Sequence, residues 1–222
     1  MVKIDFHVHT HHSVDSLTKP RDLAAKSSKL GIVPAIADHN SIAAHSEMRT
    51  LGAPFIPAEE IATDRGDLVG LYISESIPKD TPFLEAIDRI HQQGGLAYLP
   101  HMYDLGRSGK HASEEESAKV DIIEVFNARC LKKEFNDKAA AFALRHNLPG
   151  ATGSDSHFLF EFGNSYTQLE DLDISDLSDP KTLLRSLKNK KTKLVTRPAP
   201  IYVRGTTKMV YFGKKIARIF GI

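Results

Sequence analysis

The sequence of 222 residues has one cysteine, no tryptophan and no long apolar run. A single cysteine, Cys130, cannot form a disulfide within the chain, which excludes a disulfide-stapled extracellular scaffold and fits a reducing compartment. Because no run of about eighteen or more apolar residues occurs, we expect no transmembrane helix. The first residues also lack the charged and apolar regions of a signal peptide, so we expect a cytoplasmic protein.

Acidic residues are absent from the last part of the chain. Residues 181–222 contain twelve Lys or Arg and no Asp or Glu, whereas the preceding part carries 17 basic and 28 acidic residues, a balance of −11. This asymmetry indicates either a contact between the two parts or an anionic partner, such as a membrane surface or nucleic acid. We expect residues 1–200 to form one domain and residues 201–222 a basic amphipathic tail that docks on it.

The apolar patterns predict strands and helices in regular alternation. Such alternation implies parallel strand pairing with right-handed crossovers, in an open sheet or a barrel. The chain is long enough for one well-buried α/β domain. Strands are expected at residues 2–8, 32–37, 55–58, 68–73, 96–100, 121–126 and 149–153, and helices at 18–30, 42–51, 82–93 and 131–146.

Two histidines of the first expected strand, His7 and His9, are the first indication of a metal site. Residues two apart in a strand point to the same side, so the two imidazoles should project together. Neutral imidazole is a common ligand for zinc, manganese and iron. Two ordinary surface histidines would give the same pattern, but Asp155 and His157 repeat this spacing far downstream.

Polar side chains stand at or just beyond the carboxyl ends of most expected strands. In parallel α/β folds these ends form one rim, where loops build active sites. Ionisable groups gathered and buried at a rim need compensating charge, which bound cations provide. The residues are His7, His9, His39, Glu60, His101, Glu124 and Asp155.

Seven short motifs contain these residues: His7-Val8-His9, Ser13-x-Asp15, Ala37-Asp38-His39-Asn40, Ala58-Glu59-Glu60-Ile61, Pro100-His101, Glu124-Val125-Phe126-Asn127 and Gly153-Ser154-Asp155-Ser156-His157. In their order they resemble the motifs of the PHP (polymerase and histidinol phosphatase) family of metal-dependent phosphoesterases. The resemblance covers residues 1 to about 170. It implies an α/β fold, namely a distorted, TIM-like, seven-stranded β/α barrel with its metal site at the strand C-terminal ends.

The resemblance also implies two or three divalent ions, which would be manganese, zinc or iron. The ligands of the first ion would be His7, His9, Glu60 and Asp155, and those of the second Asp15, His39 and His157. A third ion would share Glu60 and take His101, with Glu59 left open as the alternative to Glu60. We expect Asp155, His101 and Glu60 to act in catalysis as well.

One position departs from the family pattern. Many relatives place a histidine after a glycine, a few residues past the bridging glutamate, as a further ligand of the third ion. Here Gly66 is followed by Asp67. A carboxylate also ligates manganese or iron and favours harder ions, so either Asp67 substitutes or the third site is weak or empty.

Other polar residues of the rim loops have candidate roles. Arg107 and Arg129 are candidates to clamp a phosphate, although each also fits a solvated surface cation. Glu124 should either orient a ligand histidine or pair with a Lys or Arg. Asp104 is a candidate proton donor to the leaving group. The histidines expected to be structural or exposed are His11, His12, His45, His91, His111 and His146.

The resemblance and the ligand set predict metal-dependent hydrolysis of a phosphate ester by a metal-bridging hydroxide. A small phosphomonoester, such as a sugar, nucleotide or amino-alcohol phosphate, is the first choice of substrate because the chain lacks long insertions. A phosphodiesterase or exonuclease acting on short oligonucleotides is the alternative, favoured by the basic tail. A catalytically idle metal-binding module is disfavoured because nearly every ligand position is filled.

Overall fold

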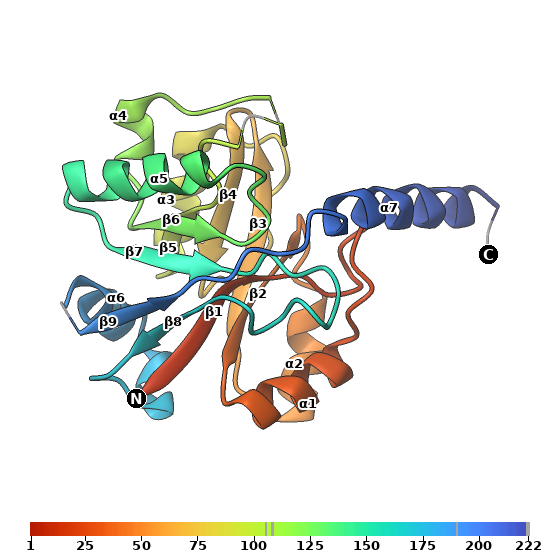
Figure 1. Ribbon diagram of the computed structural model, residues 1–222, viewed down its shortest axis with the longest axis horizontal. Coiled ribbons are helices and arrows are strands. Elements are labelled where there is room, and N and C mark those ends of the chain that lie inside the picture. The colour runs from red at the N-terminus through yellow and green to blue at the C-terminus, as the bar shows by residue number, and fades with distance from the viewer. Residues whose placement is uncertain (105, 108, 190, 221–222) are drawn as a thin grey trace.

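The computed structural model describes residues 1–104, 106–107, 109–189 and 191–220, which form one mixed sheet with helices packed around it (Figure 1). The strands are β1 (Val2–Val8), β2 (Val33–His39), β3 (Ile56–Thr63), β4 (Gly66–Leu71), β5 (Leu96–Leu99), β6 (Ile122–Asn127), β7 (Gly150–Gly153), β8 (Tyr166–Leu169) and β9 (Thr192–Val195). The helices are α1 (Pro20–Leu30), α2 (Ala44–Leu51), α3 (Phe83–Gln92), α4 (Glu114–Ser117), α5 (Lys133–Arg145), the 3-10 turn η1 (Ile174–Ser178), α6 (Pro180–Lys188) and α7 (Val203–Phe220).

The sheet curves until its first and seventh strands meet. Its order is β7-β6-β5-β4-β3-β2-β1-β8-β9, so the strands β1 to β7 form the barrel and β8 and β9 extend it beyond β1. An isolated parallel bridge between Val8 and Ser156 joins β1 to the segment after β7. The His9 N–H donates to the Ser156 carbonyl at 2.9 Å, and the Asp155 N–H to the His7 carbonyl at 2.8 Å. This nearly closed sheet confirms the expected distorted β/α barrel.

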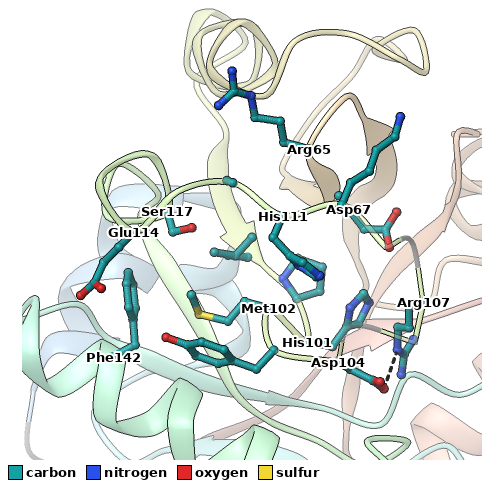
Figure 2. Close-up of a pocket in the computed structure, with 16 residues that line it drawn as sticks. Arg65, Asp67, His101, Met102, Asp104, Arg107, His111, Glu114, Ser117 and Phe142 are labelled. Carbon is teal, nitrogen blue, oxygen red and sulfur yellow. Dashed lines mark hydrogen bonds and ion pairs between the residues drawn. The ribbon is translucent and has the colours of Figure 1, made fainter.

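The direction of one barrel strand differs from the sequence-based expectation. Parallel pairing was expected throughout, but β4 runs antiparallel to both β3 and β5. Only Asp64 and Arg65 separate β3 from β4, and a connection this short forms a hairpin because parallel strands need a long crossover. The first residues of β4 therefore lie at the same rim as the last residues of β3, and Asp67 lies near His101 (Figure 2).

The apolar residues of the strands build the core beneath this rim. The largest buried cluster combines side chains from β1 to β7 with those of α6. Phe6 and Tyr98 are fully buried in it, and their rings stack with centroids 5.9 Å apart. Burying a side chain such as Phe6 stabilises the fold by about 1.5–3 kcal/mol. The Tyr98 hydroxyl points the other way and donates to Glu124 at 2.9 Å, so the core ends directly against polar groups of the rim.

The C-terminal helix α7 contacts the barrel near its beginning and then projects away from it (Figure 1). The Thr207 hydroxyl accepts from Arg129 Nη1 at 2.8 Å. Further along the helix, Lys214 Nζ donates to three carbonyl oxygens of the loop after β1. Its acceptors are His11 at 2.8 Å, Ser13 at 2.9 Å and Ser16 at 2.7 Å. The helix is thus held mainly by polar groups.

The large apolar side chains of α7 are mostly exposed. Met209, Phe212 and Ile216 are 74%, 59% and 56% exposed. The barrel-facing side carries Val203, Thr207 and Lys214 instead. No helix of the described residues is both long enough and apolar enough to cross a membrane.

Candidate metal centre

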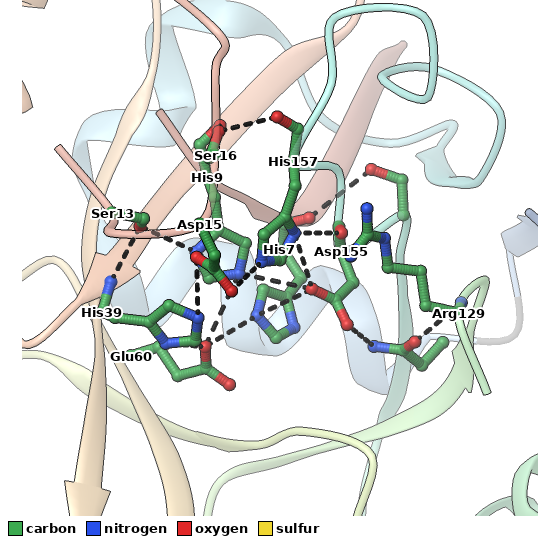
Figure 3. Close-up of polar contacts among 12 residues, drawn as sticks. His7, His9, Ser13, Asp15, Ser16, His39, Glu60, Arg129, Asp155 and His157 are labelled. Carbon is green, nitrogen blue, oxygen red and sulfur yellow. Dashed lines mark hydrogen bonds and ion pairs between the residues drawn. The ribbon is translucent and has the colours of Figure 1, made fainter. Parts of the chain in front are cut away.

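The strand ends and the loops after them gather nine ionisable side chains at one place on the rim, seven of which are labelled in Figure 3 and the other two, Asp67 and His101, in Figure 2. They come from β1 and the loop that follows it, from β2, β3 and β4, and from the segments after β5 and β7. Every residue expected as a metal ligand lies in this group, which we call the rim cluster: His7, His9, Asp15, His39, Glu60, Asp67, His101, Asp155 and His157. Within it, four triads have ligand atoms within 4.8 Å of one another, namely His9/His39/His157, His7/His9/Glu60, His7/His101/Asp155 and Glu60/Asp67/His101.

Glu60 lies at the middle of the rim cluster. Its Oε2 is 2.8 Å from His39 Nδ1 and 3.5 Å from the Nε2 atoms of both His7 and His9. Its Oε1 is 3.0 Å from His101 Nε2. The neighbouring Glu59 points to the other side of β3, where it accepts from the Ser76 hydroxyl and from the Ile77 N–H at 2.9 Å. Glu60 therefore has the position of a bridging carboxylate, and Glu59 does not.

Two aspartates complete the cluster on its other sides. Asp155 Oδ1 is 3.3 Å from His9 Nε2 and 3.5 Å from His157 Nδ1. Asp15 lies 3.2 Å from His157 Nε2 and 3.6 Å from His39 Nε2. Asp155 and His101 also have positive φ angles, 54° and 31°. Such strained backbone in residues without a glycine's freedom is typical of functional sites.

Acceptors behind the imidazoles fix which ring nitrogen carries the proton. His7 Nδ1 donates to Glu124 Oε1 at 3.2 Å, and His157 Nδ1 to the Asp155 carbonyl at 2.9 Å. His9 Nδ1 lies 3.2 Å from the Ser13 hydroxyl, which donates its own proton to Asp38 at 2.6 Å. With Nδ1 protonated, Nε2 presents a lone pair, as a metal-binding imidazole must.

Glu124 supports the cluster from below and touches histidine, tyrosine and amide groups. Besides His7 and Tyr98, it accepts from the His101 backbone N–H at 2.8 Å and from Asn127 Nδ2 at 2.9 Å. Of the two roles that the sequence left open for Glu124, the contacts correspond to orientation of a ligand histidine. Gly153 permits this approach, because a Cβ at that position would lie 2.2 Å from Glu124 Oε1 and 2.5 Å from His7 Cβ.

Several buried polar atoms of the rim cluster lack a hydrogen-bond partner. Burial without a partner is costly, and each such group in a native structure needs an explanation. Imidazole nitrogens combined with carboxylate oxygens are suitable ligands for zinc, manganese or iron, so the residues fit bound divalent cations. The atoms are the Nε2 of His7 and His9 and the Oδ1 atoms of Asp15 and Asp155.

Burial and neighbouring charges shift the pKa values of several side chains of the rim cluster. Burial and the nearby His157 and His39 hold the pKa of His9 well below its ordinary value, so that ring is neutral. Burial would raise the pKa of Glu60, but His39 and His7 hold it well below its usual range. For Asp67, burial and the negative charge of Glu60 raise the pKa. A divalent cation would favour the ionised form of each carboxylate.

The two arginines expected to bind substrate lie beside the cluster but have partners. Arg107 Nη1 is 2.5 Å from Asp155 Oδ2, and its Nε is 3.3 Å from Asp104. Arg129 is buried and bidentate on Glu161, with both N–O distances at 2.8 Å. Because its third donor is on Thr207, Arg129 ties α7 to the segment after β7.

A hollow of about 310 Å³ opens onto the cluster, and we call it the first hollow. One of its walls comes from α7, which sequence reasoning had not placed near the site. Arg204, Thr207 and Lys208 line it together with His39, Glu60 and other rim residues. The only sequence signal for this contribution was the basic charge of the tail. Arg204 Nη2 lies 2.8 Å from Asp104, and its Nη1 is buried without a hydrogen-bond partner.

Three histidines outside the rim cluster have partners elsewhere in the fold. His45 is buried and its Nε2 lies 2.9 Å from the Ala58 carbonyl, which is a structural contact. His91 and His146 pair with Asp121 and Glu114 on the surface at 2.8 and 2.9 Å.

Comparisons with known proteins agree with this geometry. A family model described as PHP-associated matches residues 133–192. An uncharacterised protein of Methanocaldococcus jannaschii is 41% identical over 203 residues, which span 87% of this chain and 82% of that protein.

Solved structures share the fold at low sequence identity. A two-domain protein from Bacteroides vulgatus that contains a predicted PHP-like metal-dependent phosphoesterase has a TM-score of 0.71 at 17% identity, over 96% of this chain and 69% of that chain. Endonuclease Q, in complex with a 27-mer duplex substrate that has an abasic lesion at the active site, has a TM-score of 0.58 at 14% identity, over 84% of this chain and 56% of that chain.

Proposed function

Because this chain belongs to the PHP (polymerase and histidinol phosphatase) family, we propose that it is a metal-dependent hydrolase of phosphate esters, with small phosphomonoesters as substrates. The observation that carries the proposal is the rim cluster itself. Nine potential ligands converge, and the buried atoms His9 Nε2 and Asp155 Oδ1 lie 3.3 Å apart, neither with a hydrogen-bond partner. Glu60 and His39 line the adjoining first hollow, whose walls also carry Arg204 and Lys208. Divalent ions bound there would activate the attacking water and neutralise phosphoryl charge.

We assign the metal ligands within this proposal as the sequence suggested. His7, His9, Glu60 and Asp155 hold one ion, and Asp15, His39 and His157 a second. Glu60, His101 and Asp67 hold a third, because the hairpin brings Asp67 within reach of the other two. We assign Asp155, His101 and Glu60 catalytic roles through the ions that they would hold, because those ions would activate the attacking water.

The protein's own cations bind and orient the phosphoryl group. Arg204, Lys208 and Arg107 all line the first hollow. Asp104 is 2% exposed and contacts both Arg107 and Arg204, so it positions the two guanidinium groups rather than delivering a proton. Arg129 acts indirectly, since its donors hold Glu161 and Thr207 in place.

Short oligonucleotides are the second candidate substrate. The basic helix α7 stands beside the first hollow, where it would follow the phosphates of a strand that enters the site. The likeness in fold to Endonuclease Q points the same way. The hollow volume of about 310 Å³ favours a small molecule, which is why the monoester comes first.

A screen of phosphate release and strand cleavage with added manganese, zinc or iron tests the proposal. Phosphomonoesters, phosphodiesters and short oligonucleotides are compared at equal concentration. We expect monoesters to be hydrolysed most efficiently, and His9→Ala to abolish turnover. His91→Ala, which changes an exposed histidine far from the rim, is the control and should retain activity. Equal turnover by wild type and His9→Ala would overturn the assigned site.

A further inference from the structure

The loop between β1 and α1 carries one ligand of the second ion and supports the other two. Asp15 lies within it, between Ser13 and Ser16. The Ser13 hydroxyl accepts from the His39 N–H at 3.1 Å. The Ser16 hydroxyl donates to the His157 carbonyl at 2.8 Å. The conformation of this loop therefore affects all three ligands that we assign to the second ion.

A lysine of the last helix holds the same loop. This residue is Lys214 of α7, which is half-buried. Its Nζ donates to three carbonyl oxygens, those of His11 at 2.8 Å, Ser13 at 2.9 Å and Ser16 at 2.7 Å. An ammonium group has three N–H donors, which matches the number of these acceptors. Ser13 and Ser16 thus contact α7 through their carbonyls and the segments of the metal ligands through their hydroxyls.

The first turns of α7 determine where Lys214 lies. Val203 is buried, and Thr207, one turn later, accepts from the buried Arg129 at 2.8 Å. Lys214 follows Thr207 by about two turns of the helix and lies on the same side of it. The contacts of Val203 and Thr207 with the barrel therefore direct Lys214 towards the loop.

The contact between α7 and this loop is mainly polar. A second hollow of about 220 Å³ remains there, lined by Val14 of the loop and by Tyr211, Lys214 and Lys215 of the helix. Tyr211 and Lys215 are exposed. Hydrogen bonds from a charged donor are stronger than those between neutral groups. Lys214 is therefore the residue that ties the loop to α7.

We propose that Lys214 is a positioning residue of the metal centre, which holds the loop in the conformation that binds the second ion. This inference rests on the proposed metal-dependent function. Lys214 acts through backbone oxygens on either side of Asp15 and contacts neither ion nor substrate. The loss of a contact that supports a metal ligand typically lowers metal affinity about 10- to 100-fold. The ligands of the first ion come from the end of β1, from β3 and from the segment after β7, so that ion should depend less on Lys214.

Manganese titration of metal-free protein by calorimetry tests the proposal. Lys214→Met keeps a long side chain and removes the three donors. We expect the affinity for the second ion to fall about tenfold or more, while the affinity for the first ion stays close to that of wild type. Asp15→Ala removes a ligand of the second ion and so identifies the binding step that belongs to it.

Two further measurements separate positioning from a general loss of stability. Hydrogen exchange of the loop should become faster in Lys214→Met, because opening of a local segment is what exchange detects. Hydrolysis of a phosphomonoester should be weak at a manganese concentration that just saturates wild type. Excess manganese should restore it, since the ligands themselves remain.

Lys215→Met is the matched control. It removes the same charge from the next residue of α7, and the three carbonyl bonds of Lys214 remain. Its metal affinities and loop exchange should be those of wild type. Lys214→Gln, which also lacks the ammonium group, is the second variant and should show the same selective loss if Lys214→Met does not fold.

The outcomes separate the role of Lys214 from the proposed function. Wild-type affinity for every ion in the Lys214 variants overturns the positioning role, and so does an equal loss for the first and second ions. The same loss in Lys215→Met also overturns it, because the charge alone would then be responsible. Wild type that binds no manganese in the rim cluster overturns the proposed function, and the role of Lys214 fails with it.

Discussion

Single acceptors behind the imidazoles control the metal affinity of the rim cluster. Glu124 accepts from His7, Tyr98, Asn127 and the His101 backbone N–H. Oε1 accepts from His7 and Tyr98, and Oε2 from the other two donors. In Glu124→Gln two donors therefore meet an amide NH₂, and the negative charge that orients His7 is lost. We expect the affinity for manganese to fall about 10- to 100-fold. Isothermal titration measures it, and an unchanged dissociation constant would contradict the positioning role.

The number of metal ions that the rim cluster binds depends on whether Asp67 is a ligand. If it ligates the third ion with Glu60 and His101, Asp67→Ala should bind one metal equivalent fewer than wild type. Asp67→His should restore that equivalent and shift the preference from manganese towards zinc, because imidazole is the softer ligand. Metal analysis of dialysed protein gives the count. Wild-type stoichiometry in Asp67→Ala would remove Asp67 from the ligand set.

The sequence predicted that the rim residues lie together because most of them stand at or just after the end of an apolar strand and in a recognisable motif. It did not predict Arg204, Thr207 and Lys208, which reach the first hollow from a helix far along the chain. No local pattern tells which face of a basic amphipathic helix will contact the barrel. The ion pairs of Arg107 and Arg129 could likewise not be predicted, because their partners Asp155 and Glu161 come from a distant segment.

At the scale of elements, most of the predicted helices and strands begin and end within a few residues of the positions expected from the sequence. α1 begins at Pro20 and ends before Gly31, whose φ of 62° suits glycine. The expected strand at 68–73 instead begins at Gly66, and its hairpin with β3 reversed the expected pairing. The strands β8 and β9 were not predicted, since each has only four residues and β9 is largely exposed.

The helix α7 gives a prediction at this scale. Lys208 lines the first hollow, whereas Lys215 lies two turns further along the same helix and away from it. Reversing the charge in Lys208→Glu should raise KM for a phosphomonoester about five- to tenfold, because one exposed charge contributes on the order of 1 kcal/mol. Lys215→Glu is the matched control with the same charge change. Equal effects of both variants on KM would show that only the overall charge matters.

For the whole molecule, metal binding and folding are coupled. The rim cluster joins six segments of the barrel, so ions bound there stabilise the native state and not the unfolded chain. Free manganese at about 100 times its dissociation constant adds about 2.7 kcal/mol per ion, which raises Tm by roughly 5–10 °C for a domain of this size. Calorimetry with manganese or with EDTA measures the shift. A shift of the same size in His9→Ala would place the stabilising metal elsewhere.

The central claim is that the rim cluster is a metal centre with more than one ion, and anomalous diffraction from manganese-loaded crystals tests it most directly. We predict two or three peaks among His7, His9, Glu60 and Asp155 and their neighbours, with adjacent ions about 3.5–4 Å apart. The contradicting result is a map without peaks in the rim cluster, or with manganese only at surface groups such as His11, His12 and Glu47.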